Sequence, residues 1–120
     1  LIQFLTKKSP LAIVTAGHED QLRKTVPKEF LNLFANLTCG DTVKNNKPSP
    51  EPYLVACKKL MKNPKTCVVV ENAPLGVTSA IEAGCYCIGV ESTCNKHQLS
   101  EAHETITEIT HLLKANVFTG

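Results

Sequence analysis

Short apolar runs alternate with amphipathic stretches along most of this 120-residue chain. The apolar runs are rich in β-branched residues, which predicts buried strands, and the stretches between them have apolar residues at helical spacing. The expected strands cover residues 11–15, 37–39, 66–71 and 86–90, with a further short strand near Thr105 and Ile106. The expected helices cover residues 1–8, 19–24, 27–33, 51–62 and 74–83, then a last helix that ends by Ala115, and residues 96–102 are expected to be helical or irregular. Strands that alternate with helices indicate an α/β fold with a parallel sheet.

The segment over residues 66–84 is the most informative part of the sequence. Its three consecutive valines predict a buried strand, and Glu71 stands at the carboxyl end of that strand. A tight turn then leads into a helix that is expected to begin at Pro74 and end at Gly84. Ligands bind at the carboxyl ends of the strands in open α/β sheets. Glu71 is therefore expected to act as a metal ligand or a catalytic carboxylate.

Two other segments also place a polar residue at a strand end or before a helix. The first predicted strand ends in Thr15, and two small residues, Ala16 and Gly17, follow it. The polar loop before the helix expected over residues 51–62 carries Lys47. We predict that Thr15, Lys47 and Glu71 meet at one edge of the sheet.

The order and spacing of Thr15, Lys47 and Glu71 resemble motifs two, three and four of the haloacid dehalogenase superfamily. The loop sequences Gly-Asp-x-Val-x-x-x-Lys-Pro-x-Pro-x-Pro-Tyr and Val-Val-Glu-Asn-Ala-Pro-Leu-Gly-Val are similar to those of its β-phosphoglucomutase-like phosphatase and mutase branch. The resemblance extends over roughly residues 1–115. It implies a Rossmann-like, doubly wound parallel sheet. It also implies a Mg²⁺-dependent phosphatase or phosphomutase that acts on a small phosphorylated metabolite through a phospho-aspartate.

The same resemblance implies a role for each residue. The Thr15 hydroxyl and the Ala16 backbone N–H would bind phosphate oxygens, and Lys47 would bring positive charge to the phosphoryl group and the nucleophile. Glu71 would bind Mg²⁺, and Asn72 stands where the family usually has a second carboxylate, so that it could still coordinate the ion but without a negative charge. Simpler interpretations stay open. Thr15 could merely end a strand or cap a helix, Lys47 could be an ordinary solvated lysine, and Asn72 could cap the helix that follows it.

Two nearby side chains offer alternative chemistry. His18 could serve as an acid or a base, although we expect it at a helix start near solvent. Asp41 is expected to shape its loop as a turn residue rather than to act as a nucleophile.

The first motif of the family, a strand that ends in Asp-x-Asp, is missing from the sequence. Asp20 and Asp41 are the only aspartates, and neither follows an apolar strand. The chain begins with Leu1, and its one methionine is Met61. We therefore expect residues 1–120 to form a single α/β domain that is the carboxyl-terminal part of a longer protein, without the first strand, the cap and the nucleophile.

The place of the missing strand provides a structural test. In the fold that the resemblance implies, this strand is central and lies between the strands that end at Thr15 and Glu71. Its absence would leave two half-sheets whose unpaired edges face a slot, a situation that proteins avoid. The alternative is that those two strands pair directly and close the gap.

Composition argues against several classes of partner. The 13 basic and 11 acidic residues give a net charge of +2 and are scattered, so we expect no nucleic-acid and no membrane partner. No apolar run approaches the ~20 residues of a membrane span. Six cysteines in a chain with α/β patterning favour a reduced, cytoplasmic protein. A zinc site from Cys85, Cys87, Cys94 and His97 is the sharper alternative, but it lacks the usual C-x₂₋₄-C spacing.

Two rival functions also stay open. The chain could be a truncated or degenerate relative that serves as a non-catalytic binding or structural module, which Asn72 and the missing Asp-x-Asp favour and Thr15 and Lys47 oppose. The other rival is a flavodoxin-like nucleotide-binding domain, which the absence of a G-x-G-x-x-G or P-loop sequence weakens.

Overall fold

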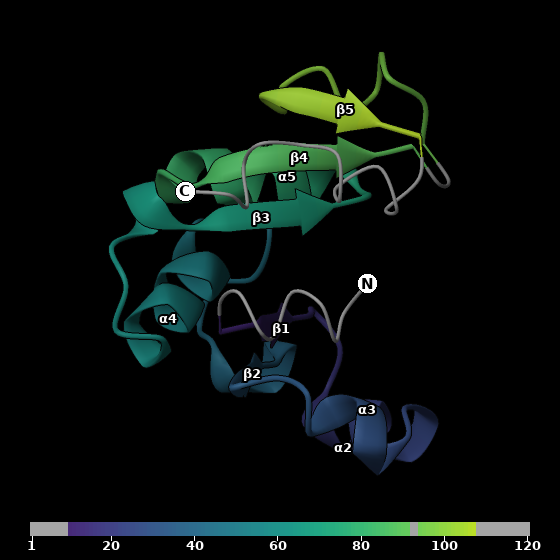
Figure 1. The fold of residues 1–120 in the computed structure, drawn as a ribbon, viewed down its shortest axis with the longest axis vertical. Coiled ribbons are helices and arrows are strands. Elements are labelled where there is room, and N and C mark those ends of the chain that lie inside the picture. Colours follow the sequence, from purple (N-terminus) through teal and green to yellow (C-terminus); the bar gives the residue numbers. More distant parts are fainter. Residues whose placement is uncertain (1–9, 92–93, 108–120) are drawn as a thin grey trace.

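The computed structural model describes residues 10–91 and 94–107, and the statements below concern these residues. Within them the strands form two parallel sheets (Figure 1). In the smaller sheet β1 (Ala12–Val14) pairs with β2 (Asn36–Thr38). In the larger sheet β4 (Tyr86–Val90) lies between β3 (Val68–Glu71) and β5 (Glu104–Ile106). The predicted α/β class with parallel strands is confirmed, and each predicted strand is present. The bounds differ by one or two residues: β2 lies one residue earlier than predicted, and β3 begins at Val68 instead of residue 66, because Pro64–Thr66 form a 3₁₀ turn.

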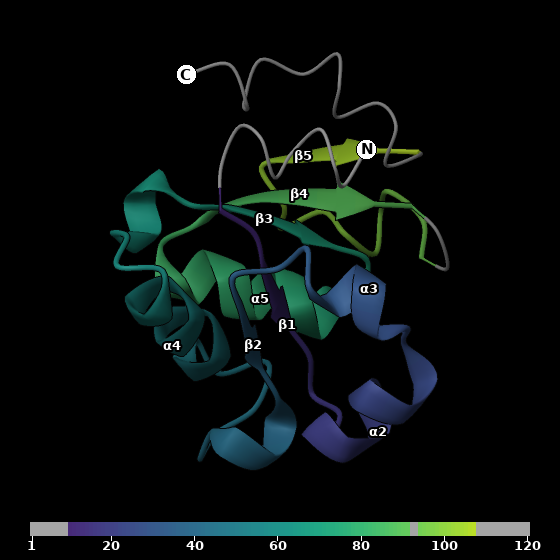
Figure 2. The same cartoon turned by 60° about the horizontal axis from the view of Figure 1, so that its bottom comes forward.

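Helices α4 and α5 pack against each other and hold the two sheets together. The helices of the described part are α2 (Glu19–Thr25), α3 (Lys28–Leu31), α4 (Glu51–Lys59) and α5 (Pro74–Ala83), with 3₁₀ turns η1 (Gly40–Thr42) and η2 (Pro64–Thr66). α5 packs against β3 and β4, whereas α4 packs against β1, β2 and α5. Figure 2 shows both helices below β3 and β4. The two sheets are therefore joined through helix packing rather than through strand pairing.

The hydrophobic core lies between α4, α5 and the larger sheet. Val77 and Ala80 of α5 are 1% and 0% exposed. They pack in one cluster with Tyr53 of α4 and Cys87 of β4. α5 ends at Gly84, where a positive φ of 92° favours glycine. Both ends of α5 are where the sequence predicts them.

The outer edges of β1 and β3 have no strand beside them within the described residues. Thr15 N donates to Thr38 O, so the backbone groups of Val14 point away from β2, because successive residues of a strand face opposite edges. Cys67 O accepts from the first residue of β4, so the backbone groups of Val70 point away from β4. β1 and β3 do not pair with each other. The alternative of direct pairing is wrong, and both edges are open as far as residues 10–91 and 94–107 are concerned.

The end of α4 differs from the prediction. The helix ends at Lys59 instead of residue 62, because Met61 has a positive φ of 57°. Met61 N donates to Lys58 O and Lys62 N donates to Cys57 O, which is the hydrogen-bond pattern of a Schellman end. Met61 fits the helical spacing of the apolar residues in 51–62, but it is 89% exposed and does not lie on the inner face of the helix.

The other predictions concern irregular and terminal segments. Residues 96–102 form turns and a bend, one of the two expected outcomes, and the short strand near Thr105 is β5. The helices predicted over residues 1–8 and up to Ala115 lie outside the described residues. In the part of the chain that the structure describes, no helix is long and apolar enough to cross a membrane.

Candidate functional site

Lys47 lies between η1 and α4, in a loop that the first turn of α4 holds in place. The Glu51 carboxylate accepts from Lys44 N at 2.6 Å and from the backbone and side-chain nitrogens of Asn45 at 3.2 and 3.1 Å. These hydrogen bonds, the one from Lys44 first, lower the pKa of Glu51 because they favour its charged form. The loop is therefore fixed shortly before Lys47.

The ammonium group of Lys47 joins the carboxyl ends of the two sheets. Its Nζ lies 2.9 Å from Glu71 Oε2, at the end of β3, and 3.4 Å from Val14 O, at the end of β1. The Lys47 and Glu71 side chains are 16% and 9% exposed, so each charge depends on the other for compensation. The structure brings Lys47 and Glu71 together as the sequence predicts, while their roles stay predictions.

Glu71 Oε2 has a second donor in the hydroxyl of Tyr53, at 2.5 Å. Burial first, and then the negative charge of Glu71, raises the pKa of Tyr53 above the usual range of a phenol. The hydroxyl therefore stays protonated and acts as the hydrogen-bond donor to Glu71. The other carboxylate oxygen, Oε1, accepts from Asn72 N at 3.1 Å. The two oxygens of Glu71 therefore have different surroundings.

Helix α5 contributes two small residues to the site. Ser79, which is fully buried, donates its hydroxyl to Ser49 O at 2.6 Å and so holds the Lys47 loop from a second side. Gly76 makes room for the carboxylate, because a Cβ at that position would lie 2.0 Å from Glu71 Cδ. The glycine and the serine of α5 thus position the acidic and the basic partner respectively.

The Thr15 loop lies directly after β1 and rests on Gly40. The Thr15 hydroxyl oxygen accepts from Gly17 N at 3.1 Å, and Gly40 N donates to Gly17 O at 2.8 Å. A Cβ at position 40 would lie 1.9 Å from Ala16 O, so the backbone there approaches closely, while Ala16 itself is exposed. The interpretation of Thr15 as a helix cap is wrong, because the N-cap of α2 is His18.

Three further interpretations concern the side chains of Asn72, His18 and Asp41. Asn72 does not cap α5, since the N-cap is Ala73 and no side-chain cap bond is present there, so that interpretation is wrong. His18 is exposed at the start of α2, as expected. Asp41 Oδ1 accepts from Glu19 N at 3.2 Å and ties η1 to α2, which agrees with its expected loop role.

The sequence reasoning missed the residues that support the site. Tyr53 belongs to the quoted loop sequence, but its helical spacing groups it with the apolar core and does not tell where its hydroxyl points. A buried tyrosine needs a hydrogen-bond partner, which was the available signal. The other supporting residues missed are Gly40, Glu51, Gly76 and Ser79, whose roles depend on contacts distant in sequence.

Glu71 and Asn72 offer oxygen atoms at the end of β3, and oxygen ligands are those that Mg²⁺ prefers. Within residues 10–91 and 94–107, no group of three or more His, Cys, Asp or Glu side chains could hold a metal ion. A carboxylate and an amide oxygen suit a hard cation but make up only part of an octahedral set. The donor types fit Mg²⁺, with the other ligands left to water, substrate or another segment.

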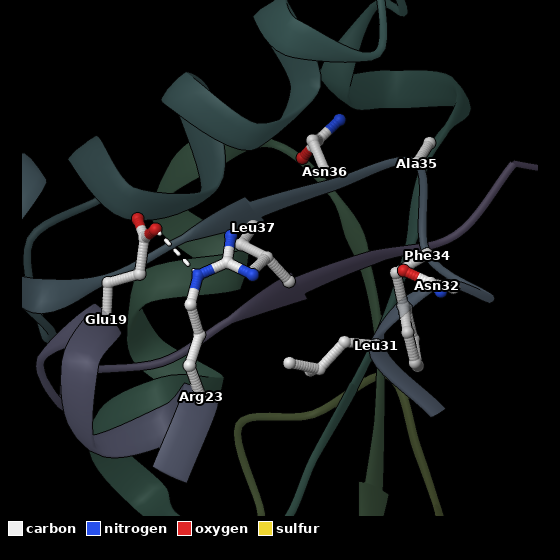
Figure 3. Close-up of a pocket in the computed structure, with 8 residues that line it drawn as sticks. All are labelled: Glu19, Arg23, Leu31, Asn32, Phe34, Ala35, Asn36 and Leu37. Carbon is white, nitrogen blue, oxygen red and sulfur yellow. Dashed lines mark hydrogen bonds and ion pairs between the residues drawn. The ribbon is translucent and has the colours of Figure 1, made fainter. Parts of the chain in front are cut away.

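A separate cavity of about 330 Å³ lies beside β2 (Figure 3). At its rim Arg23 Nε and Glu19 Oε2 form an ion pair at 2.9 Å. The residues that line it are Glu19, Arg23, Leu31, Asn32, Phe34, Ala35, Asn36 and Leu37. None of them belongs to the Lys47–Glu71 site, so this cavity is a different feature of the surface.

The chain is similar to proteins of one family. Residues 1–90 match the family model described as haloacid dehalogenase-like hydrolase. The chain is 33% identical over 113 residues to validoxylamine A 7′-phosphate phosphatase from Streptomyces hygroscopicus subsp. limoneus, a match that covers 93% of this chain and 53% of the relative. A solved structure from Thermotoga maritima, assigned as a β-phosphoglucomutase, superimposes with a TM-score of 0.80 at 31% identity and covers 94% of this chain and 56% of that one.

A third relative was solved with a phosphorylated sugar. CbbY from Rhodobacter sphaeroides, in complex with xylulose-(1,5)-bisphosphate, superimposes with a TM-score of 0.70 at 25% identity and covers 87% of this chain and 51% of that one. The chain thus spans about half the length of the relatives it matches.

Proposed function

The chain belongs to the haloacid dehalogenase-like hydrolases, and from this premise we propose that its protein is a Mg²⁺-dependent phosphoryl-transfer enzyme. The reaction is that of a phosphatase or a phosphomutase on a small phosphorylated metabolite. The observation that carries the proposal is the Lys47–Glu71 ion pair where β1 and β3 end. Phosphoryl transfer demands mainly positioning and charge neutralisation, and a fixed cation beside a carboxylate suits both demands.

Each residue of the site has a proposed task. Lys47 neutralises the phosphoryl group and the nucleophile with a compact charge and three N–H donors. The Thr15 hydroxyl and the Ala16 N–H bind phosphoryl oxygens, which the close support of the loop by Gly40 favours. Glu71 and Asn72 hold Mg²⁺, which neutralises phosphoryl oxygens when it is bound.

The proposed nucleophile belongs to a segment outside this sequence. Asp41 is engaged with the start of α2, and Asp20 lies on α2 itself. We propose that a further strand, ending in the Asp-x-Asp pair, lies between β1 and β3. The outward-facing backbone groups of Val14 and Val70 would pair with this strand. Its end would then lie beside Lys47, which already contacts Val14 O.

A sugar phosphate is the proposed class of substrate. One relative was solved with xylulose-(1,5)-bisphosphate, and another is named for the 7′-phosphate of validoxylamine A. We also propose a reducing compartment, the cytoplasm, because all six cysteines are free thiols.

Supplying the missing strand tests the proposal. The chain is fused to an N-terminal segment that has a strand ending in Asp-x-Asp followed by a cap, and hydrolysis of p-nitrophenyl phosphate is measured with Mg²⁺. The 120-residue chain alone should show no turnover above background. The fusion should show Mg²⁺-dependent turnover that falls by about 100-fold or more in Lys47→Ala.

Lys44→Ala is the matched control, because Lys44 is an exposed lysine of the same loop whose backbone, not its side chain, bonds Glu51. Its turnover should equal that of the unchanged fusion. Turnover by the chain alone would contradict the proposed source of the nucleophile, and turnover that ignores Lys47→Ala would contradict the site.

A non-catalytic module is the second candidate function. The observation that favours it is Asn72, which has no charge at a place where the family usually has a carboxylate. Asn72→Asp in the same fusion separates the two candidates. Activity that appears only in this variant would identify the chain as a degenerate relative.

A further inference from the structure

We propose that Tyr53 is a positioning residue of this site: its hydroxyl and Lys47 together hold Oε2 of Glu71, which leaves Oε1 to bind a ligand. The inference rests on the proposed function, because the ligand at Oε1 is the Mg²⁺ of that reaction. Tyr53 itself touches neither substrate nor metal.

The contact between Tyr53 and Glu71 has the features of a strong hydrogen bond. The two oxygen atoms are 2.5 Å apart, and a neutral phenol donates to a carboxylate, which makes the bond charge-assisted. Tyr53 is 6% exposed and Glu71 is 8% exposed, so water has little access to replace the hydroxyl. Removal of the hydroxyl would leave Lys47 as the donor that still holds Oε2.

Gly76 closes the space beside the same oxygen. A Cβ at that position would lie 2.1 Å from Oε2, so α5 packs directly against it. Oε2 is thus confined between α5, Tyr53 and Lys47. Oε1 lies on the side of Asn72, whose N–H it accepts and which is the other proposed metal ligand. The carboxylate is therefore held in one orientation, with Oε1 on the side where Asn72 lies.

Tyr53 also contacts the cationic partner. Lys47 Nζ lies 5.2 Å from the centre of its ring, within the range of a cation–π interaction. The face of the ring contacts the cation while its hydroxyl contacts the carboxylate. One side chain at the start of α4 thereby sets the position of the carboxylate relative to the ammonium group, and such supporting contacts keep the groups of a site in register.

The chain contains a matched control for this tyrosine. Tyr86 also donates its hydroxyl to a carboxylate, Glu104 Oε2, at 2.7 Å, but between β4 and β5 and away from the site. Binding of Mn²⁺, as a substitute for Mg²⁺, is measured by calorimetry on the unchanged chain, Tyr53→Phe and Tyr86→Phe. We expect Tyr53→Phe to weaken Mn²⁺ binding by about 10-fold and Tyr86→Phe to leave it unchanged. Equal affinities in the two variants would overturn the proposal.

A second measurement does not depend on the metal. In a Tyr86→Phe background Tyr53 is the sole tyrosine, and its hydroxyl proton is followed by NMR at neutral pH. We expect a separate, slowly exchanging hydroxyl signal, because the proton lies between two buried oxygen atoms that are 2.5 Å apart. A hydroxyl proton that exchanges too fast to give a signal would show that the bond to Glu71 is absent, and would overturn the proposal.

The two measurements separate the inference from the function on which it rests. Absence of Mn²⁺ binding in the unchanged chain would count against the proposed metal site, and the NMR signal of the Tyr53 hydroxyl proton would then decide the role of Tyr53 toward Glu71 by itself. A protected Tyr53 hydroxyl together with metal binding that responds to Tyr53→Phe supports both.

Discussion

Two glycines position the backbone and the carboxylate of the site at the scale of single atoms. Gly40 lies against the Ala16 carbonyl, and Gly76 lies against the Glu71 carboxylate, each too close for a Cβ. Neither has a positive φ, unlike Gly84. These two positions therefore require glycine for space and not for backbone conformation. A side chain at either one would push a site group out of place.

Gly40→Ala should displace the Ala16 peptide and destabilise the fold. The expected loss is about 1–3 kcal/mol, the usual cost of overpacking. Gly17→Ala is the control, because a Cβ there would lie 3.5 Å from Thr15 Oγ1, an ordinary contact. Urea unfolding measures the free energy of unfolding of both variants. The dependence of this free energy on urea concentration should be the same in both, so that a shift of the midpoint reports stability alone. Equal stability of the two would show that the Gly40 contact does not constrain the loop.

At the scale of elements, the open edges of β1 and β3 are the feature with the clearest consequence. A strand edge that has no neighbour leaves its N–H and C=O groups without ladder partners. In β3 the backbone of Val69 faces β4, whereas that of Val68 and Val70 faces the open edge. Neighbouring residues of one short strand should therefore differ in protection.

We expect the amide protons of Val68 and Val70 to exchange with solvent much faster than that of Val69. The reason is that only the Val69 N–H faces the paired edge, and exposed amides exchange without an opening step. Hydrogen exchange followed by NMR measures each amide in the isolated chain. In the fusion that supplies a strand, the exchange of Val68 and Val70 should slow. Equal protection of all three valines in the isolated chain would show that something pairs with the open edge.

At the scale of the whole molecule, the two sheets are joined by α4, α5 and the Lys47 bridge. This packing brings several thiols into the core, where Cys85 and Cys87 are 2% and 0% exposed. Burial first raises the pKa of Cys67 to about 11 and that of Cys87 to about 12, from 9.0. A pKa that is higher in the folded state stabilises the fold below the unfolded pKa, and this contribution is lost as the pH rises toward the folded value.

The free energy of unfolding should therefore fall as the pH rises from 9.0 toward about 12. Each unit changes the folding equilibrium by at most about tenfold through Cys87. Urea unfolding at a series of pH values measures the slope, and Cys87→Ala should make it shallower than in the unchanged chain. A stability that stays flat across this interval would contradict the burial of these thiols in solution.

Much of this architecture follows from the sequence because its causes are local. The valine run before Glu71 and the Pro74 and Gly84 boundaries act within a few residues, and they predict the carboxyl end of β3 and both ends of α5 where the structure has them. The order of Thr15, Lys47 and Glu71 along the chain was enough to predict the family. Met61 shows the limit of local reasoning, since its apolar side chain fits the helical spacing but its backbone ends the helix.

The tertiary structure decided which groups meet. The sequence could place Lys47 and Glu71 near strand ends, but only the packing of α4 against α5 brings the Tyr53 hydroxyl to the same carboxylate oxygen as Lys47. The pairing of the strands was likewise not predictable from local sequence, because the sequence pattern of a strand is the same whether its second edge is paired or open. Short-range propensity fixes elements, whereas contacts between residues far apart in sequence fix the site, and those contacts form only when the elements pack.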